Sequence, residues 1–216
     1  MKEEINSYND TEDIFEFDFT SNKENNIIHF KNLPLEPVKF TSDEDLVKNT
    51  YYFGYEFLNN DKASSKVRTK FFHELKFNDK FTSNENRNRF IRNVINRLHE
   101  KINIYHFDVV IFPTSRSPLN QHIIKVLSNI TNMELNTYEL VEKMLSEIKF
   151  EFKPFKVPRK YSQDAKVIIN AKNILVLDDA STTGATLLQC LRSIRTLNTN
   201  ANVVLFTLVG KKDIFG

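Results

Sequence analysis

One segment decides most about the predicted fold: Ile174-Leu175-Val176-Leu177-Asp178-Asp179-Ala180-Ser181-Thr182-Thr183-Gly184-Ala185-Thr186. Its first four residues are apolar, which is typical of a short strand buried on both faces. Two carboxylates follow where the strand should end, and a run of small residues leads into a helix that we expect over 186–197. A strand, a tight loop and a helix in this order predict one unit of a parallel α/β sheet.

The run of small residues favours the binding of an anion. The first amides of the following helix have no acceptor within the helix, and the helix dipole is positive at that end. A phosphate group satisfies both, and small side chains let the backbone approach it closely. Gly184 permits a backbone conformation that a side chain would hinder. Hydroxyl donors are available from Ser181, Thr182, Thr183 and Thr186.

Asp178 and Asp179 should meet a different part of the same ligand, because they would repel a phosphate. Neighbouring ribose hydroxyls can donate to two carboxylates, which can also hold Mg²⁺ directly or through water. The acid pair and the phosphate loop together therefore predict a phosphorylated sugar. The alternative is a strand–turn–helix connection without a ligand, in which an Asp caps the helix. The complete order of apolar strand, two acids, small hydroxyl-rich loop and helix argues against this alternative. A Walker P-loop is excluded, since Gly-Lys-Ser/Thr is absent.

Similar patterns extend outward from this segment. Apolar strands are predicted over 109–112, 167–169 and 203–206, and helices over 86–104, 119–130 and, more weakly, 137–148. Residues 149–164, with two prolines and five basic residues, suggest an exposed loop. Short apolar strands that alternate with helices predict an α/β fold with a doubly wound, mainly parallel central sheet and helices on both faces.

The N-terminal region has a different pattern. Residues 14–19 alternate apolar and acidic side chains, as an edge strand would, and 26–30 and 38–40 are strand candidates separated by a proline loop. A helix is expected over about 46–58. These patterns predict a small arm or hood over 1–60, partly disordered at its start, and a main domain over 61–216. A coil that packs its phenylalanines on the main body is the alternative.

Composition limits the other classes of function. The 216 residues carry 30 basic and 28 acidic side chains, a net charge of +2, which gives no electrostatic case for nucleic-acid binding. No apolar run approaches the length of a membrane helix, and the acidic start is unlike a signal peptide, so we expect a cytoplasmic protein without a membrane partner. The single cysteine, Cys190, excludes an internal disulfide. A homodimer is left open.

Residues 174–186 resemble the phosphoribosyl pyrophosphate signature of the type I phosphoribosyltransferase family. The resemblance implies that Asp178 and Asp179 are the catalytic residues, contacting the ribose hydroxyls and Mg²⁺. It implies that the 5-phosphate is held by a group of consecutive residues: Ala180, Ser181, Thr182, Thr183, Gly184, Ala185 and Thr186.

The same resemblance suggests two further loops. The family holds pyrophosphate after the first core strand, and the matching residues here are Thr114, Ser115, Arg116 and Ser117. Arg116 could offer paired donors to pyrophosphate oxygens, although this loop lacks the glycine that common members have. The family also closes a mobile basic loop over its substrate. The matching residues in 149–164 are Lys153, Lys156, Arg159 and Lys160.

Within the superfamily, the order of three segments is similar to that of ComF-type proteins: Leu75-Lys76-Phe77, residues 108–113, and Leu119-Asn120-Gln121. The four-cysteine zinc module that often precedes such domains is absent. The implied function is Mg²⁺-dependent transfer of phosphoribosyl from phosphoribosyl pyrophosphate to a nitrogen nucleophile, a base or amine, with release of pyrophosphate. Two alternatives stay open. One is a non-catalytic sensor or regulatory adaptor that binds phosphoribosyl pyrophosphate or a nucleotide. The other is a ComF-like accessory protein in DNA uptake or a mobile-element system.

Overall fold

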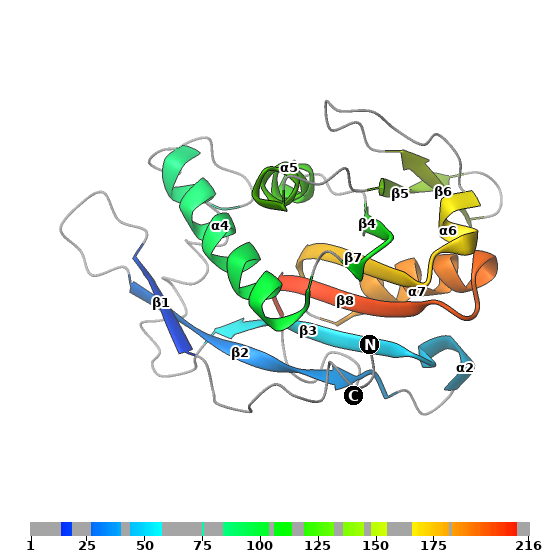
Figure 1. The fold of residues 1–216 in the computed structure, drawn as a ribbon, viewed down its shortest axis with the longest axis horizontal. Coiled ribbons are helices and arrows are strands. Elements are labelled where there is room, and N and C mark those ends of the chain that lie inside the picture. The colour runs from blue at the N-terminus through cyan, green and yellow to red at the C-terminus, as the bar shows by residue number, and fades with distance from the viewer. Residues whose placement is uncertain are drawn as a thin grey trace.

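A computed structural model describes residues 14–18, 27–39, 44–57, 75, 84–103, 106–113, 119–131, 136–144, 148–154, 166–181 and 183–210. Its centre is an eight-stranded sheet with the strand order β1-β2-β3-β8-β7-β4-β5-β6 (Figure 1). The elements are β1 (Ile14–Asp18), β2 (Ile27–Pro37), α2 (Glu44–Val47), β3 (Thr50–Phe57), α4 (Asn84–Lys101), β4 (Val109–Pro113), α5 (Leu119–Thr131), β5 (Asn136–Met144), β6 (Ile148–Pro154), α6 (Lys166–Asn170), β7 (Asn173–Ala180), α7 (Ala185–Leu197) and β8 (Asn202–Val209).

The middle of the sheet is parallel. β3 pairs with β8, β8 with β7, β7 with β4, and β4 with β5, all in parallel register. Antiparallel pairing occurs only toward the two edges, where β1 and β2 extend the sheet beyond β3 and β6 pairs with β5. The carboxyl ends of the five parallel strands therefore lie at one edge of the sheet, which is where ligands bind in such folds.

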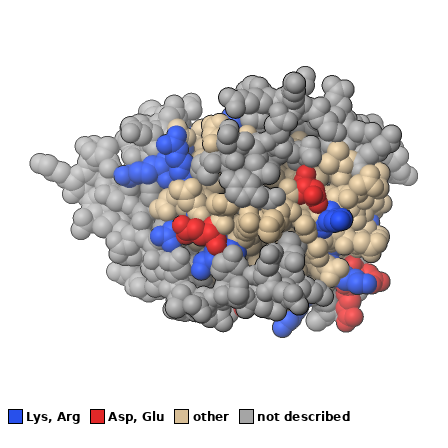
Figure 2. All heavy atoms as spheres, in the orientation of Figure 1, with Lys and Arg blue, Asp and Glu red and all other residues tan. Residues whose placement is uncertain are grey.

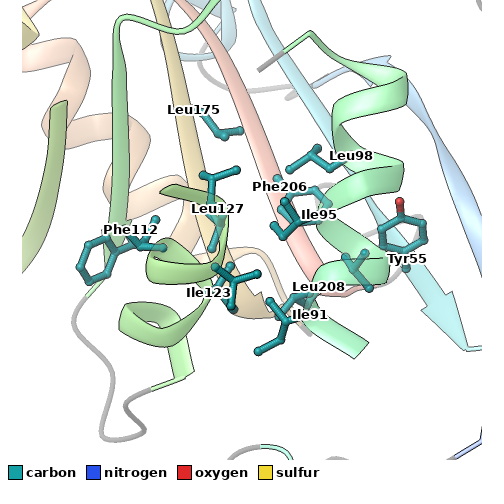
Figure 3. Packing of buried hydrophobic residues seen from close by; sticks show 14 of the residues in the cluster. Tyr55, Ile91, Ile95, Leu98, Phe112, Ile123, Leu127, Leu175, Phe206 and Leu208 are labelled. Atoms are coloured by element: carbon teal, nitrogen blue, oxygen red, sulfur yellow. The ribbon is translucent and has the colours of Figure 1, made fainter. Parts of the chain in front are cut away.

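Two apolar clusters cover the two faces of the sheet. Successive side chains of a strand point to opposite faces, so Leu175 and Leu177 join one cluster while Ile174 and Val176 join the other. Helices α4 and α5 pack on the first face (Figure 3), and α2, α6 and α7 contribute to the cluster on the second. This arrangement confirms the predicted α/β fold with helices on both faces of a mainly parallel sheet.

Several predicted elements are confirmed within a few residues. They are the strands expected at 14–19, 109–112, 174–177 and 203–206 and the helices expected at 86–104, 119–130 and 186–197. Each has a strong local pattern. The helices carry apolar residues at helical spacing, and three of these strands are continuous apolar runs bounded by turns. The tertiary contacts of these segments agree with their local patterns.

The helix predicted over 46–58 is wrong. Helix α2 ends at Val47, Asn49 adopts a left-handed backbone with φ 53°, and the chain then forms β3. The segment is rich in aromatic residues, which favour strands. Tyr52 packs in the cluster on the α7 face while Phe53 and Tyr55 pack in the other. A strand buried on both faces shows no alternation of apolar and polar residues, so the sequence lacks the pattern by which a half-exposed strand is recognised.

The predicted helix over 137–148 is also wrong, because β5 and β6 form an antiparallel pair there. The start of the predicted 149–164 loop belongs to β6. Residues 148–153, Ile-Lys-Phe-Glu-Phe-Lys, alternate apolar and charged side chains with the period of a strand. β5 adds to β4 in parallel and β6 covers the outer side of β5, which shields an otherwise open edge.

Two shorter segments also differ from expectation. Residues 167–169 form part of the short helix α6, in which Ile168 is buried beneath α7 while Ile169 is 47% exposed. The expected proline loop after residue 30 is instead a continuous strand, β2, with a register shift between Leu33 and Glu36. Proline has no backbone N–H to donate to a neighbouring strand, so Pro34 is accommodated at this irregularity.

The division of the chain at residue 60 stays a prediction, although β3 belongs to the central sheet.

Neither sign of charge dominates among the described residues on the face drawn in Figure 2. Basic and acidic side chains of the described residues lie there in separate small groups of both signs. Within the described ranges, no helix combines the length and the apolar character that crossing a membrane requires.

Candidate ligand-binding site

The site is built on the carboxyl end of β7. Asp178 lies opposite Thr207 of β8, and Ala180, the last residue of β7, lies opposite Val209. The Ser181 amide extends this pairing by one residue, since it donates to the Val209 carbonyl at 2.9 Å. The loop that follows is therefore held at a defined height above the sheet edge before α7 begins.

The two carboxylates leave the strand on opposite faces. Ile174 and Val176 face the α7 side, so the period of a strand starts Asp178 on that side and Asp179 on the other, although the Asp178 carboxylate at the strand end also reaches Asn120 in the first turn of α5. Both side chains are deeply buried, at 5% and 2% exposure. The sequence predicted the pair but not this division, and the two acids address different sides of the strand end.

The thiol of Cys190 supports the placement of Asp178 beneath α7. Burial raises the pKa of this thiol far above its usual value, and the negative charge of Asp178 raises it further. A thiol with so high a pKa is protonated and unreactive at neutral pH. Cys190 is thus a buried small side chain on the inward face of α7.

Asp178 Oδ1 accepts two hydrogen bonds that fix its position. One comes from the backbone amide of Asp179 at 2.8 Å and the other from Asn120 Nδ2 at 3.3 Å. Asn120 lies in the first turn of α5 and also donates to the Pro113 carbonyl at 3.2 Å. The ends of β7 and β4 and the start of α5 thus meet around one carboxylate.

Sequence reasoning did not select Asn120, although a signal was present. Helical spacing from Asn120 leads to Ile123, Ile124 and Leu127, which are all fully buried. A polar residue therefore stands in line with the apolar stripe of α5. Such a residue needs a polar partner in the core, and that partner is Asp178, 58 positions away in the sequence.

The loop between β7 and α7 has the form expected for an anion site. Gly184, at the N-cap of α7, has a left-handed backbone (φ 70°, ψ −4°), and its amide donates to Ser181 Oγ at 3.0 Å. Residues with a Cβ rarely adopt this backbone conformation. Ala185 and Thr186 then open the helix on the exposed surface. The Ala185 amide, the first of α7, approaches Thr183 Oγ1 at 3.5 Å, and the helix dipole is positive at this end.

A tightly packed hydroxyl pair borders this edge on the β8 side. Tyr52 Oη of β3 and Thr207 Oγ1 of β8 are 2.9 Å apart and buried. Two glycines make room for them. A Cβ at Gly54 would come within 2.7 Å of Thr207 Oγ1, and one at Gly210 would overlap Tyr52 Oη. The strand β3 is therefore fitted closely against the strand that neighbours Asp178.

Most of the predicted phosphoribosyl-binding residues are brought together at this strand end. Asp178 to Ser181 and Thr183 to Thr186 follow one another there, whereas Thr182 lies outside the described residues. The predicted pyrophosphate residues, Thr114 to Ser117, also lie outside them, but Pro113 and Leu119 fix both ends of their loop. Because β4 pairs with β7 in parallel, that loop starts at the same sheet edge as the acids.

The predicted mobile-loop residues are only partly described. Lys153 lies in β6, opposite Glu139 of β5, and so belongs to a strand in this structure. β6 is separated from β7 by β4 and β5 in the sheet. Lys156, Arg159 and Lys160 lie outside the described residues. A substrate contact by any of the four stays a prediction.

Comparison with known proteins finds likenesses in structure only. No family model matches the sequence, and no curated protein matches it significantly. The chain is similar to a purine phosphoribosyltransferase from Pyrococcus horikoshii, at 14% identity and a TM-score of 0.35, over 57% of this chain and 84% of that one. It is also similar to a xanthine-guanine-hypoxanthine phosphoribosyltransferase from Helicobacter pylori, at 11% identity and a TM-score of 0.40, over 60% of this chain and 76% of that one.

A third similar structure is a hypothetical protein from Neisseria gonorrhoeae with bound ppGpp. It shares 14% identity with this chain at a TM-score of 0.36, over 59% of this chain and 68% of the other. Likenesses of this size do not carry a function from one protein to another. The function therefore has to be inferred from the residues of the site itself.

Proposed function

We propose that the carboxyl end of β7 binds the ribose 5-phosphate part of phosphoribosyl pyrophosphate and that the protein is a phosphoribosyltransferase. One observation carries the proposal: two buried carboxylates near the end of a core strand lead directly, through a short loop and a left-handed Gly184, into the N-terminus of α7. Carboxylates accept hydrogen bonds from sugar hydroxyls, and helix N-termini bind phosphate. A ligand that carries both groups side by side is a sugar phosphate.

In this proposal the backbone of residues 180–186 surrounds the 5-phosphate. The hydroxyls of Ser181, Thr182, Thr183 and Thr186 add donors, while Asp178 and Asp179 accept from the ribose hydroxyls. Because the two acids leave β7 on opposite faces, we expect them to hold the sugar from two sides and so to set its orientation. A fixed orientation lowers the entropic barrier to attack at C1.

The residues also suit a magnesium ion that arrives with its ligand. Among the described residues no three acidic, histidine or cysteine side chains cluster as a metal cage. Mg²⁺ is usually held by one or two carboxylates together with substrate phosphates and water. Asp178 and Asp179 would supply the carboxylates, directly or through water. The ion would offset charge on the diphosphate.

We further propose that the loop after β4 holds the pyrophosphate. Thr114, Ser115, Arg116 and Ser117 start from the strand next to β7, so their loop lies within one strand spacing of the acids at its base. Arg116 would donate two parallel hydrogen bonds to phosphate oxygens. In the reaction a nitrogen nucleophile forms a bond to C1, the bond from C1 to the pyrophosphate oxygen breaks, and the nitrogen loses a proton. Basic residues at 153–160 would then shield this centre from water.

The decisive experiment is calorimetry with phosphoribosyl pyrophosphate in the presence of Mg²⁺. We predict binding by the natural chain and a loss of at least about tenfold in affinity when Asp178→Asn and Asp179→Asn are combined, because two acceptors are weakened. Glu100→Gln, an exposed carboxylate at the far end of α4, serves as the matched control. The absence of binding to the natural chain, or equal affinity in the double variant, would contradict the proposal.

Turnover is tested separately by pyrophosphate release across a panel of purine, pyrimidine and amine acceptors. Release with one acceptor class identifies the second substrate. Binding without release from any acceptor would instead assign the protein to the non-catalytic sensors. A DNA-binding assay at several salt concentrations addresses the accessory role in DNA uptake, since phosphate contacts make DNA affinity fall steeply with salt. The oligomeric state, including a homodimer, is measured on the same samples by light scattering.

A further inference from the structure

The Asp178 carboxylate is held by donors from two different elements. Its Oδ1 accepts from the Asp179 amide at 2.8 Å and from Asn120 Nδ2 at 3.3 Å. The first donor belongs to the next residue of the same strand, so it moves together with the carboxylate. The second comes from the first turn of α5 and is independent of β7. Asn120 is therefore the contact that fixes the plane of the carboxylate relative to the rest of the sheet edge.

Asn120 is itself firmly placed. Its Nδ2 also donates to the carbonyl of Pro113, at 3.2 Å, and β4, which ends at Pro113, pairs with β7 in parallel. A carbonyl and an ionised carboxylate only accept hydrogen bonds, so a flipped amide would place an oxygen against two oxygens. One amide nitrogen thus bridges the ends of two neighbouring strands.

Packing does not explain an asparagine at this position. Asn120 is 1% exposed, and its Oδ1 has no hydrogen-bond partner among the described residues. A buried acceptor without a partner loses its hydration without compensation. A leucine of similar volume would continue the apolar stripe of α5 and would bury no such acceptor. The two Nδ2 contacts are therefore what the asparagine provides.

Two donors on one oxygen determine which atom of Asp178 a ligand meets. A carboxylate oxygen accepts about two hydrogen bonds through its lone pairs, and Oδ1 already has two. A sugar hydroxyl that reaches Asp178 has to donate to Oδ2, in a plane that Asn120 fixes. A phosphate group gains nothing from this arrangement, because it is bound by amides and hydroxyls and not by carboxylates.

We propose that Asn120 is a positioning residue for sugar recognition. It orients Asp178 so that Oδ2 accepts from a ribose hydroxyl, and the site thereby prefers a sugar phosphate to a phosphate monoester without a sugar. The inference rests on the proposed function, which assigns Asp178 to the ribose. Without Asn120 the carboxylate turns about its side-chain bonds and has to be ordered when the sugar binds, which lowers the affinity.

The test compares ribose 5-phosphate with methyl phosphate by NMR titration of the full chain, which measures weak binding and shows that each variant is folded. No Mg²⁺ is added, so a lost metal contact cannot account for a change. In Asn120→Leu the affinity for ribose 5-phosphate should fall by about fivefold or more, as for a weakened hydrogen bond to a charged group. The affinity for methyl phosphate should stay within about twofold, because no carboxylate contact is involved. Gln121→Leu, the adjacent half-buried residue of α5, is the matched control and should keep both affinities.

A double-mutant cycle shows whether Asn120 acts through Asp178. Asp178→Ala removes the carboxylate that Asn120 orients, and it should itself weaken the binding of ribose 5-phosphate. When Asn120→Leu is added to Asp178→Ala, the affinity should change by no more than about twofold, because residues that act through one contact are not additive. A purely structural role of Asn120 would lower the affinity further in this background.

The outcomes separate the inference from the proposed function. If the natural chain prefers ribose 5-phosphate and Asn120→Leu keeps this preference, or weakens both ligands equally, the inference is wrong and the proposed function stands. An undiminished effect of Asn120→Leu beside Asp178→Ala overturns it in the same way. If the natural chain binds ribose 5-phosphate no more tightly than methyl phosphate, both are wrong. Should Asn120→Leu fail to fold, Asn120→Ala, which also lacks the donor, decides by the same comparison.

Discussion

At the scale of single residues, Gly184 is the position where the backbone itself limits substitution. Its φ of 70° lies in the left-handed region, which costs a residue with a Cβ about 1–2 kcal/mol. Gly184→Ala should therefore lower the free energy of unfolding by roughly this amount, as measured by urea denaturation. It should also weaken phosphate binding, because the loop shifts relative to α7.

A matched variant separates strain from other effects. Asparagine tolerates the left-handed region better than alanine does, so Gly184→Asn should lose less stability than Gly184→Ala even though its side chain is larger. Equal losses in the two variants would show that space at this position, and not backbone conformation, is what glycine provides.

Some residues of the site could be predicted from the sequence alone, and others could not. The segment from Asp178 to Thr186 was predictable because its residues are neighbours in the chain, and a strand, loop and helix place them together without help from elsewhere. Asn120 reaches Asp178 only through the pairing of β4 with β7. That contact depends on the strand order, which no local pattern specifies.

At the scale of elements, Arg195 fastens α7 to the segment around α2 and β3. Its buried guanidinium donates to the carbonyls of Leu46 at 3.1 Å and Ala201 at 2.9 Å, and to Thr50 Oγ1 at 3.0 Å. It also bonds to the Lys48 carbonyl. Burial lowers the pKa of this group, which indicates that the charge is partly desolvated. The planar fork of donors satisfies several acceptors at once, which a lysine could not do.

Arg195→Met should therefore be strongly destabilising. It leaves buried carbonyls without a donor, at about 1–3 kcal/mol for each group left unsatisfied, and we expect a total loss of about 3 kcal/mol in the free energy of unfolding. Arg192→Met, on the exposed side of the same helix, is the control and should change stability by no more than about 0.5 kcal/mol. Comparable effects in the two variants would argue against a specific role for Arg195.

The prediction of helices and strands succeeded where apolar residues recur with a single clear period. It failed where a strand is buried on both faces, because apolar side chains then occupy successive positions. Helix α4 shows apolar residues every three or four positions, and its predicted range was close. Strand β3 has apolar or aromatic residues on both faces, so its sequence also suits a helix. Only its place between β2 and β8 decides for the strand, and that place follows from the whole sheet.

At the scale of the whole molecule, β3 makes the N-terminal region part of the main core. Phe53 stacks on Phe206 of β8 with ring centroids 5.7 Å apart, and Tyr55 meets the same ring edge-on at 6.2 Å. Both belong to the cluster beneath α4, which also contains Phe30 of β2. The cluster on the α4 face is thus assembled from segments on both sides of residue 60.

This packing predicts that residues 61–216 do not fold as an independent unit. Replacing one buried phenylalanine by alanine costs about 3–5 kcal/mol, and a domain is stable by only about 5–15 kcal/mol in total. Removal of residues 1–57 would expose Phe206 and break the Arg195 contacts with Leu46, Lys48 and Thr50, so that chain should show no cooperative thermal unfolding. Removal of residues 1–26, where β1 at the sheet edge is the one described element, should leave a cooperative transition at a lower temperature. A cooperative transition in the shorter chain would mean instead that the sheet from β8 to β6 is stable without β3, and that the boundary at residue 60 separates two units.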